Sequence, residues 1–134
     1  MRYISSLEGI SSEMLTGFFV GWNSHPSTDK HLEMLHNSYK VVLAIDDNSN
    51  QVVGFISAIS DGVLSAYIPL LEVLPAYQNK GIGQELVSCM LDELQDIYMI
   101  DLICDEELQA YYERLGMLRS TGMVVRNYKF QVGR

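Results

Sequence analysis

The chain has 134 residues, a length that favours one compact domain over residues 1–134. Hydrophobic residues make up 48% and charged residues 19%, a composition too apolar for a disordered chain. Nine Lys and Arg against 17 Asp and Glu give a net charge of -8, which disfavours nucleic acid as a partner. The same charge suits a cationic substrate, although a surplus of carboxylates often serves only solubility.

Two cysteines, Cys89 and Cys104, are too few for a disulfide scaffold and lack the CxxC spacing of a zinc or redox site. No segment reaches the roughly 18 uncharged apolar residues that a membrane span needs. We therefore expect a cytoplasmic protein with free thiols, no bound metal and no membrane partner.

The first third of the chain predicts a short strand within residues 1–6 and two helices. The first helix begins at Ser11 or Ser12, because apolar residues up to Trp22 recur at helical spacing. A proline then interrupts the pattern, and Thr28 or Asp29 caps a second helix that ends near residue 38.

The middle of the chain predicts three antiparallel strands. Residues 41–45 and 52–56 are apolar runs joined by a polar turn, which favours a hairpin. Residues 64–74 form a further strand, in which Pro69 is expected to interrupt the hydrogen-bond ladder.

The last third predicts a helix whose apolar face runs from Leu86 to Leu94, a strand over 99–104, a helix from Asp105 to Gly116 and a final strand over 123–130. Helices and strands in this order indicate a mixed α/β (α+β) fold and not a regular βαβ alternation.

The most informative segment is the glycine loop that follows the strand over 64–74 and opens the next helix. Gly81 and Gly83 allow close approach to backbone amides that carry the positive end of the helix dipole, so the loop can hold a phosphate or pyrophosphate. Lys80 and Gln78 add a cation and an amide donor. The plain alternative is a tight turn that starts a helix. The GxxxxGK[ST] motif of Walker-type phosphate loops is absent. The GxGxxG motif of a dinucleotide-binding fold also fails, because Leu86 stands at the third glycine, although Asp101 lies about 20 residues further on, where such a fold has an acidic residue.

Two segments carry a family resemblance. Gln78-Asn79-Lys80-Gly81-Ile82-Gly83 resembles the (R/Q)xxGx(G/A) loop of the GNAT superfamily of acyl-CoA-dependent N-acyltransferases. The segment 105–117 is similar to the NxxAxxFYxxxGF motif of the same family. The resemblance implies a central mixed, mostly antiparallel twisted sheet flanked by about four helices.

The resemblance also implies a cosubstrate site for acetyl-CoA. Its pyrophosphate would lie on the amides of the loop, and its pantetheine would run beside the strand that ends at Val73, whose amide would polarise the thioester carbonyl. In the family a bulge separates this strand from the one over 99–104, and Pro69 or Glu72 is expected near it. The implied cofactor-binding residues are Leu71, Val73, Gln78, Lys80, Gly81, Ile82, Gly83, Gln84 and Asp105.

Two residues are predicted to be catalytic. Tyr112 stands where the family places the general acid that protonates the departing thiolate; without the motif it would be a packing residue beside Tyr111. Glu72 is a carboxylate within an apolar strand and is a candidate general base, directly or through water; the alternative is a side chain that faces solvent. Cys104 as a covalent nucleophile and the three histidines as catalytic groups are weaker hypotheses.

Three positions depart from the family pattern: Asp105 replaces asparagine, Leu108 replaces alanine, and Gln84 replaces a small hydroxyl residue. None removes a group that the phosphate site requires, and Asp105 can serve as a helix cap alone.

The sequence therefore predicts an N-acetyltransferase that moves an acetyl group from acetyl-CoA directly to a primary amine in a ternary complex. The alternative is a CoA-binding sensor or interaction module without catalysis. The acceptor class, a small cationic amine or a peptide amine, stays open, and a homodimer through the C-terminal strand is one possibility.

Overall fold

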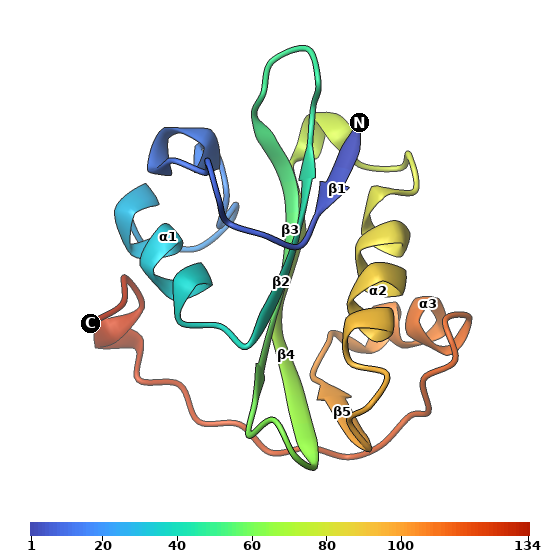
Figure 1. The fold of residues 1–134 in the computed structure, drawn as a ribbon. Coiled ribbons are helices and arrows are strands. Elements are labelled where there is room, and N and C mark those ends of the chain that lie inside the picture. Colours follow the sequence, from blue (N-terminus) through green and yellow to red (C-terminus); the bar gives the residue numbers. More distant parts are fainter.

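The computed structural model describes residues 1–134 and contains one five-stranded sheet in the order β1-β2-β3-β4-β5. Three α-helices flank it (Figure 1). The mixed α/β architecture predicted from the sequence is confirmed. The strands are β1 (Arg2–Ile4), β2 (Lys40–Ile45), β3 (Val52–Ser60), β4 (Ser65–Val73) and β5 (Met99–Leu102). The helices are α1 (Thr28–His36), α2 (Ile82–Glu93) and α3 (Gln109–Glu113).

Strands β1 to β4 are antiparallel, whereas β4 and β5 run parallel over only four residue pairs, from Ser65↔Met99 to Ile68↔Leu102. The β3–β4 register shifts between Ser57 and Ile59, opposite the stretch of β4 that contains Pro69. Proline lacks the N–H that a ladder needs, so the expected interruption at Pro69 is confirmed. Beyond it, β4 continues to Val73 with β3 as its only partner.

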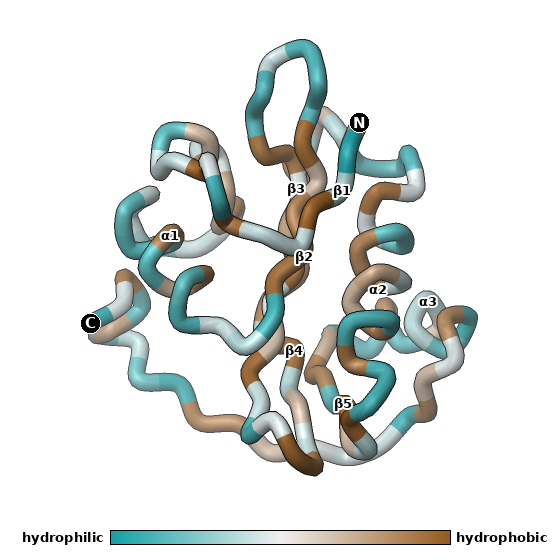
Figure 2. Tube along the Cα trace, in the orientation of Figure 1, coloured by the Kyte–Doolittle hydropathy of each residue, from teal (hydrophilic) through white to brown (hydrophobic).

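The core lies on both faces of β2 and β3, where apolar residues are concentrated (Figure 2). Helix α1 covers one face of the sheet, and α2 and α3 lie on the other (Figure 1). Helix α2 approaches β3 closely at Gly54, where a Cβ atom would lie 3.0 Å from a methyl carbon of Leu86. Glycine at this position therefore sets how deeply α2, and the glycine loop before it, sits on the sheet.

The helix predicted from Ser11 or Ser12 to Trp22 is wrong. Only the 3-10 turn η1 (Ser12–Leu15) forms, because Gly17, Phe19 and Gly21 all have positive φ angles that no right-handed helix contains. Phe18 and Phe19 are nevertheless buried at 5% and 4% exposure. The apolar spacing up to Trp22 therefore indicated which side chains are buried in the core, but it did not indicate a helical backbone.

The strand predicted over 123–130 is also wrong. This stretch is irregular apart from the 3-10 turn η4 (Tyr128–Phe130), and Met123 and Val125 are 98% and 82% exposed. A strand needs a neighbour to complete its ladder, and none lies alongside here. The cap of α1 differs as well: Ser27, and not Thr28 or Asp29, accepts a hydrogen bond from the Lys30 amide at 3.1 Å.

His31 on α1 is buried in an aromatic cluster. Its ring centroid lies 4.5 Å from that of Phe55, 4.9 Å from Phe19 and 5.5 Å from Phe18. Neither ring nitrogen has a hydrogen-bond partner, and burial lowers the pKa of His31 to about 4.

This burial predicts an acid-dependent loss of stability. The unfolded chain binds a proton at His31 near pH 6.5 and the folded chain only near pH 4, so the free energy of unfolding should fall as the pH drops through this window. Urea unfolding at several pH values measures the slope. His31→Phe should flatten it, whereas the same replacement at exposed His36 should not; an unchanged slope in His31→Phe would contradict this account.

Candidate functional site

The glycine loop lies between the end of β4 and the first turn of α2. Asn79 and Gly81 have φ angles of +62° and +82°, which turn the chain so that α2 begins at Ile82. The first backbone bond into the helix is donated by the amide of Glu85 to the carbonyl of Gly81 at 3.1 Å. The amides of Ile82, Gly83 and Gln84 precede that bond and have no helical acceptor, so they can donate to an anion.

Two hydrogen bonds hold this loop in place. The Gln78 side chain donates through Nε2 to the carbonyl of Val73 at 3.0 Å, and the Tyr77 hydroxyl donates to the Asp46 carboxylate at 2.6 Å. Gln78 therefore ties the loop to the strand before it, a role that the sequence did not indicate. Tyr77 connects the loop to the hairpin between β2 and β3, and the ammonium of Lys80 lies 5.5 Å above the Tyr77 ring.

The end of β4 offers an unpaired strand edge beside the loop. Residues 70–73 pair with β3 on one side, but β5 ends its pairing at Ile68. The backbone groups of Leu71 and the N–H of Val73 that face away from β3 are therefore available to an extended ligand that hydrogen-bonds like a strand, whereas the Val73 carbonyl is already bonded to Gln78. The predicted phosphate loop and the predicted pantetheine strand lie next to each other.

Helix α3 packs against this region through Tyr111. A Cβ atom built on Gly83 would lie 3.4 Å from the Tyr111 hydroxyl oxygen and 3.8 Å from a methyl carbon of Val73. The rings of Tyr111 and Tyr112 meet edge to face with their centroids 5.0 Å apart. Tyr111 therefore contacts both the first turn of α2 and the predicted acid Tyr112. The sequence position of Tyr112 alone does not reveal this placement.

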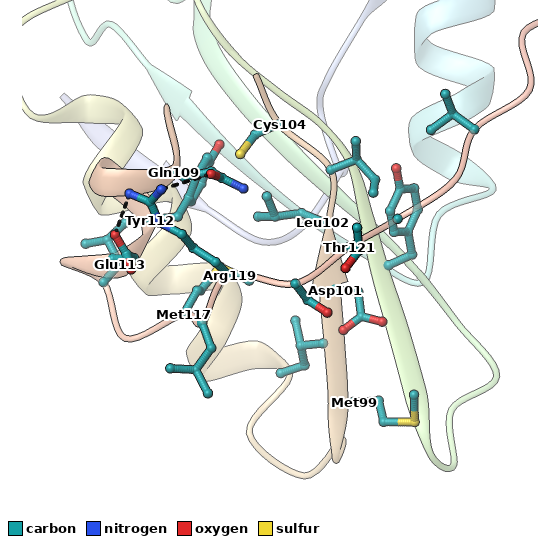
Figure 3. Close-up of a pocket in the computed structure, with 18 of the residues that line it drawn as sticks. Met99, Asp101, Leu102, Cys104, Gln109, Tyr112, Glu113, Met117, Arg119 and Thr121 are labelled. Carbon is teal, nitrogen blue, oxygen red and sulfur yellow. Dashed lines mark hydrogen bonds and ion pairs between the residues drawn. The ribbon is translucent and has the colours of Figure 1, made fainter. Parts of the chain in front are cut away.

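Tyr112 lies half-buried at the edge of the core. Burial raises the pKa of Tyr112 to about 12, with smaller contributions from Tyr111 and Cys104. A raised pKa keeps the phenol protonated throughout the neutral range, which is the state that a proton donor needs. Cys104 is a free thiol that lies beside Tyr112 (Figure 3).

Glu72 faces the loop between η1 and α1. Its Oε1 accepts a hydrogen bond from the Phe19 amide at 2.8 Å, and its Oε2 accepts one from the Val20 amide at 3.2 Å. These two bonds hold Phe19 in a left-handed conformation with φ of +65°. A carboxylate has about four acceptor positions, so two of them remain for an amine or a water. The sequence did not indicate the two amides as partners of Glu72.

Asp105 lies at the N-cap position of the 3-10 turn η3 (Glu106–Leu108), but its side chain makes no capping hydrogen bond. Its carboxylate is exposed. No cluster of three or more His, Cys, Asp or Glu residues is placed to hold a metal ion. No helix combines the length and apolarity that crossing a membrane requires.

A hollow of about 1430 Å³ is lined mainly by β5, α3 and residues 115–126, and no residue of the glycine loop lines it. Tyr112 lines it together with Cys104, the weaker candidate nucleophile, and with side chains of β5 and of residues 117–126 (Figure 3). None of the residues predicted to bind the cosubstrate lines this hollow.

Comparison with known proteins places this geometry in a family. The Acetyltransferase (GNAT) family profile matches residues 7–117. The chain belongs to the GNAT family. A solved structure from Deinococcus radiodurans R1, assigned as an acetyltransferase, is 41% identical and superposes with a TM-score of 0.96 over 99% of this chain and 92% of its own.

Other GNAT relatives are more distant. A GNAT family acetyltransferase from Streptococcus pneumoniae TIGR4 is 27% identical, with a TM-score of 0.73 over 94% of this chain and 97% of its own. The GCN5-related N-acetyltransferase 3, chloroplastic, of Arabidopsis thaliana is 32% identical over 114 residues, which are 84% of this chain and 46% of that protein. The chain spans about half the length of the curated relatives that it matches.

Proposed function

We infer that this GNAT protein transfers the acetyl group of acetyl-CoA to a primary amine in a ternary complex. The observation that carries the proposal is the adjacency of three features: free amides at Ile82–Gln84, the unpaired edge at the end of β4, and the protonated phenol of Tyr112. Acetyl-CoA supplies an activated thioester carbonyl. The amides and the β4 edge match its pyrophosphate and its amide-containing pantetheine chain.

Glu72, Val73 and Tyr112 have separate roles in the proposed reaction. Glu72, directly or through a water, accepts a proton from the protonated amine, since only the free amine is nucleophilic. The Val73 amide donates to the carbonyl oxygen as negative charge develops there. As the amine nitrogen bonds to the carbonyl carbon and the carbon–sulfur bond breaks, Tyr112 donates its proton to the departing sulfur. Positioning of the two substrates contributes the remaining part of the rate acceleration.

The acceptor is proposed to be a small cationic amine or a peptide amine. The surplus of carboxylates attracts cations, and the candidate base lies beside the loop that carries Phe19, Trp22 and His25. The ring centroids of Trp22 and His25 lie 5.0 Å and 6.4 Å from that of Phe19. Aromatic faces next to a carboxylate suit an ammonium group.

Thermal unfolding tests cosubstrate binding without a known acceptor. Acetyl-CoA and CoA should raise the melting temperature, and NADH should not, because only a ligand of the native state stabilises it. Gly81→Ala should abolish the shift, since its φ of +82° suits glycine and the loop must change shape.

Gly9→Ala is the matched control. Gly9 has a φ of +79° and, like Gly81, no atom within 4 Å of the added Cβ, so both variants carry a similar backbone cost. Gly9→Ala should melt earlier but keep the full acetyl-CoA shift. A shift retained in Gly81→Ala would contradict the phosphate site, and binding without acetyl transfer across an amine panel would favour a sensor.

A further inference from the structure

The loop between η1 and α1 places exposed apolar residues next to the Glu72 carboxylate. Glu72 accepts hydrogen bonds from the amides of Phe19 and Val20 at 2.8 Å and 3.2 Å, so the carboxylate lies against this loop. Val20 is 59% exposed, and Trp22 is 39% exposed. Apolar residues that are open to solvent beside a proposed reacting group can contact the rest of the substrate.

Trp22 is held in place by aromatic rings that reach the sheet. The Trp22 amide donates to the Phe19 carbonyl at 3.2 Å, and the ring centroids of these two residues lie 5.0 Å apart. The buried Phe19 ring meets the rings of His31 and Phe55 edge to face at 4.9 Å and 6.3 Å, and Phe55 is a fully buried residue of β3. The exposed indole is therefore positioned before a ligand arrives, which lowers the entropy cost of binding.

Glu72 has no charged partner within the chain. None of the five ion pairs of the protein includes it. Residues 16–27 contain no Asp, Glu, Lys or Arg, and Glu72 is the only such residue in β3 and β4. The net charge of -8 therefore arises from other segments, which can steer a cation towards the protein. The loop and these strands offer one carboxylate to one ammonium group, and the further ammonium groups of a polyamine would meet no carboxylate on them.

We propose that the acceptor is a small primary monoamine with an aromatic group close to its nitrogen, and that Trp22 is the residue that selects it. The inference rests on the proposed acetyl transfer, because that reaction places the amine nitrogen at Glu72. The aromatic group then packs on Trp22 and Val20. The acceptor is thereby narrowed to one chemical class, and Trp22 gains a specificity-determining role that lies outside both the glycine loop and the segment 105–117.

The fluorescence of Trp22 tests binding without any need for turnover, because Trp22 is the only tryptophan of the chain. The unaltered protein is saturated with CoA, which has no acetyl group to transfer, and is titrated with phenethylamine, ethylamine or spermidine. Phenethylamine should change the emission saturably at concentrations about tenfold below those of the other two amines, as one added aromatic contact predicts. No saturable change with phenethylamine, or a response to spermidine at lower concentrations, overturns the proposal.

Replacement of Trp22 tests its role in selection. The ratio of kcat/KM for phenethylamine to kcat/KM for ethylamine should fall about tenfold in Trp22→Ala and stay within about twofold of the wild-type ratio in Trp22→Phe, which keeps an aromatic ring. A partial loss of folded enzyme cancels in this ratio, because both amines are measured on the same protein. An unchanged ratio in Trp22→Ala contradicts selection by Trp22.

Tyr39→Ala is the matched control for Trp22→Ala. Tyr39 is an aromatic residue of similar exposure, 42%, and it directly precedes β2, outside the loop that contacts Glu72. This variant should keep the wild-type ratio.

The selection of the acceptor and the acetyl transfer fail in different ways. A saturable fluorescence change with phenethylamine but no release of thiol from acetyl-CoA would refute acetyl transfer and support the aromatic amine as the ligand of this loop. Thiol release that is as efficient with ethylamine or spermidine as with phenethylamine would support acetyl transfer and overturn selection by Trp22.

Discussion

Replacing Tyr112 with Phe is expected to lower kcat by about 100-fold or more, the range of general acid catalysis, while the affinity for acetyl-CoA stays within about twofold. The hydroxyl is the only group removed, and the ring that packs at the edge of the core remains. Since the pKa of Tyr112 is raised to about 12, the wild-type phenol stays protonated below that pH. The alkaline side of its pH–rate profile should therefore show no loss from this group up to about pH 11.

Tyr111→Phe is the matched control, because it removes the same atom from the adjacent residue. The Tyr111 hydroxyl lies against Gly83 and not towards the proposed acid position, so kcat should change little and cosubstrate affinity more. Steady-state kinetics with a coupled thiol assay measures both variants. Equal turnover in Tyr112→Phe and wild type would remove the acid role.

Replacing Glu72 separates its chemical role from its structural one. Glu72→Gln keeps an oxygen for the Phe19 amide but cannot accept a proton, so kcat should fall by about 100-fold at neutral pH. The loss should shrink as the pH rises, because the amine acceptor then arrives deprotonated. Glu72→Ala should in addition lower the free energy of unfolding by about 1–3 kcal/mol, since two amides lose their acceptor and Phe19 its support.

Glu13→Gln is the control for this pair, since Glu13 is an exposed carboxylate in η1, close in sequence to Phe19. It should leave turnover and stability unchanged. Urea unfolding and pH–rate profiles of the three variants give the comparison. If Glu72→Gln retains full turnover at neutral pH, Glu72 acts only by positioning the Phe19 loop.

The sequence predicted those parts of the fold in which a local pattern and its tertiary environment agree. The hairpin of β2 and β3, helix α2 and the bulge at Pro69 follow from apolar runs, helical spacing and a missing N–H. The first helix failed because Glu72, 53 residues from Phe19, satisfies amides that a helix would have bonded internally. The last strand failed because a β-prone segment is a strand only where a partner lies alongside it.

The candidate site shows the same difference between features that a local pattern predicts and features that depend on long-range contacts. The loop from Gln78 to Gly83 was recognisable because its glycines serve a local backbone shape. The contact of Tyr111 with Gly83 and the bond from Tyr77 to Asp46 join segments about 28 and 31 residues apart, and no periodicity in the sequence encodes such pairs. Motif spacing located the chemistry, and packing determined which groups surround it.

The short parallel contact between β4 and β5 also bears on how the chain folds. The β2–β3 hairpin closes between Ile45 and Val52, seven residues apart, whereas Ser65 and Met99 are 34 residues apart, with α2 between them. Contacts of large sequence separation carry the greater loop-closure entropy and tend to form late. We expect the β4–β5 contact to form after the β2–β3 and β3–β4 hairpins, as does the β1–β2 pairing, whose residues Arg2 and Ile45 are 43 apart. A partly folded chain then has its hairpins but no place for the cosubstrate.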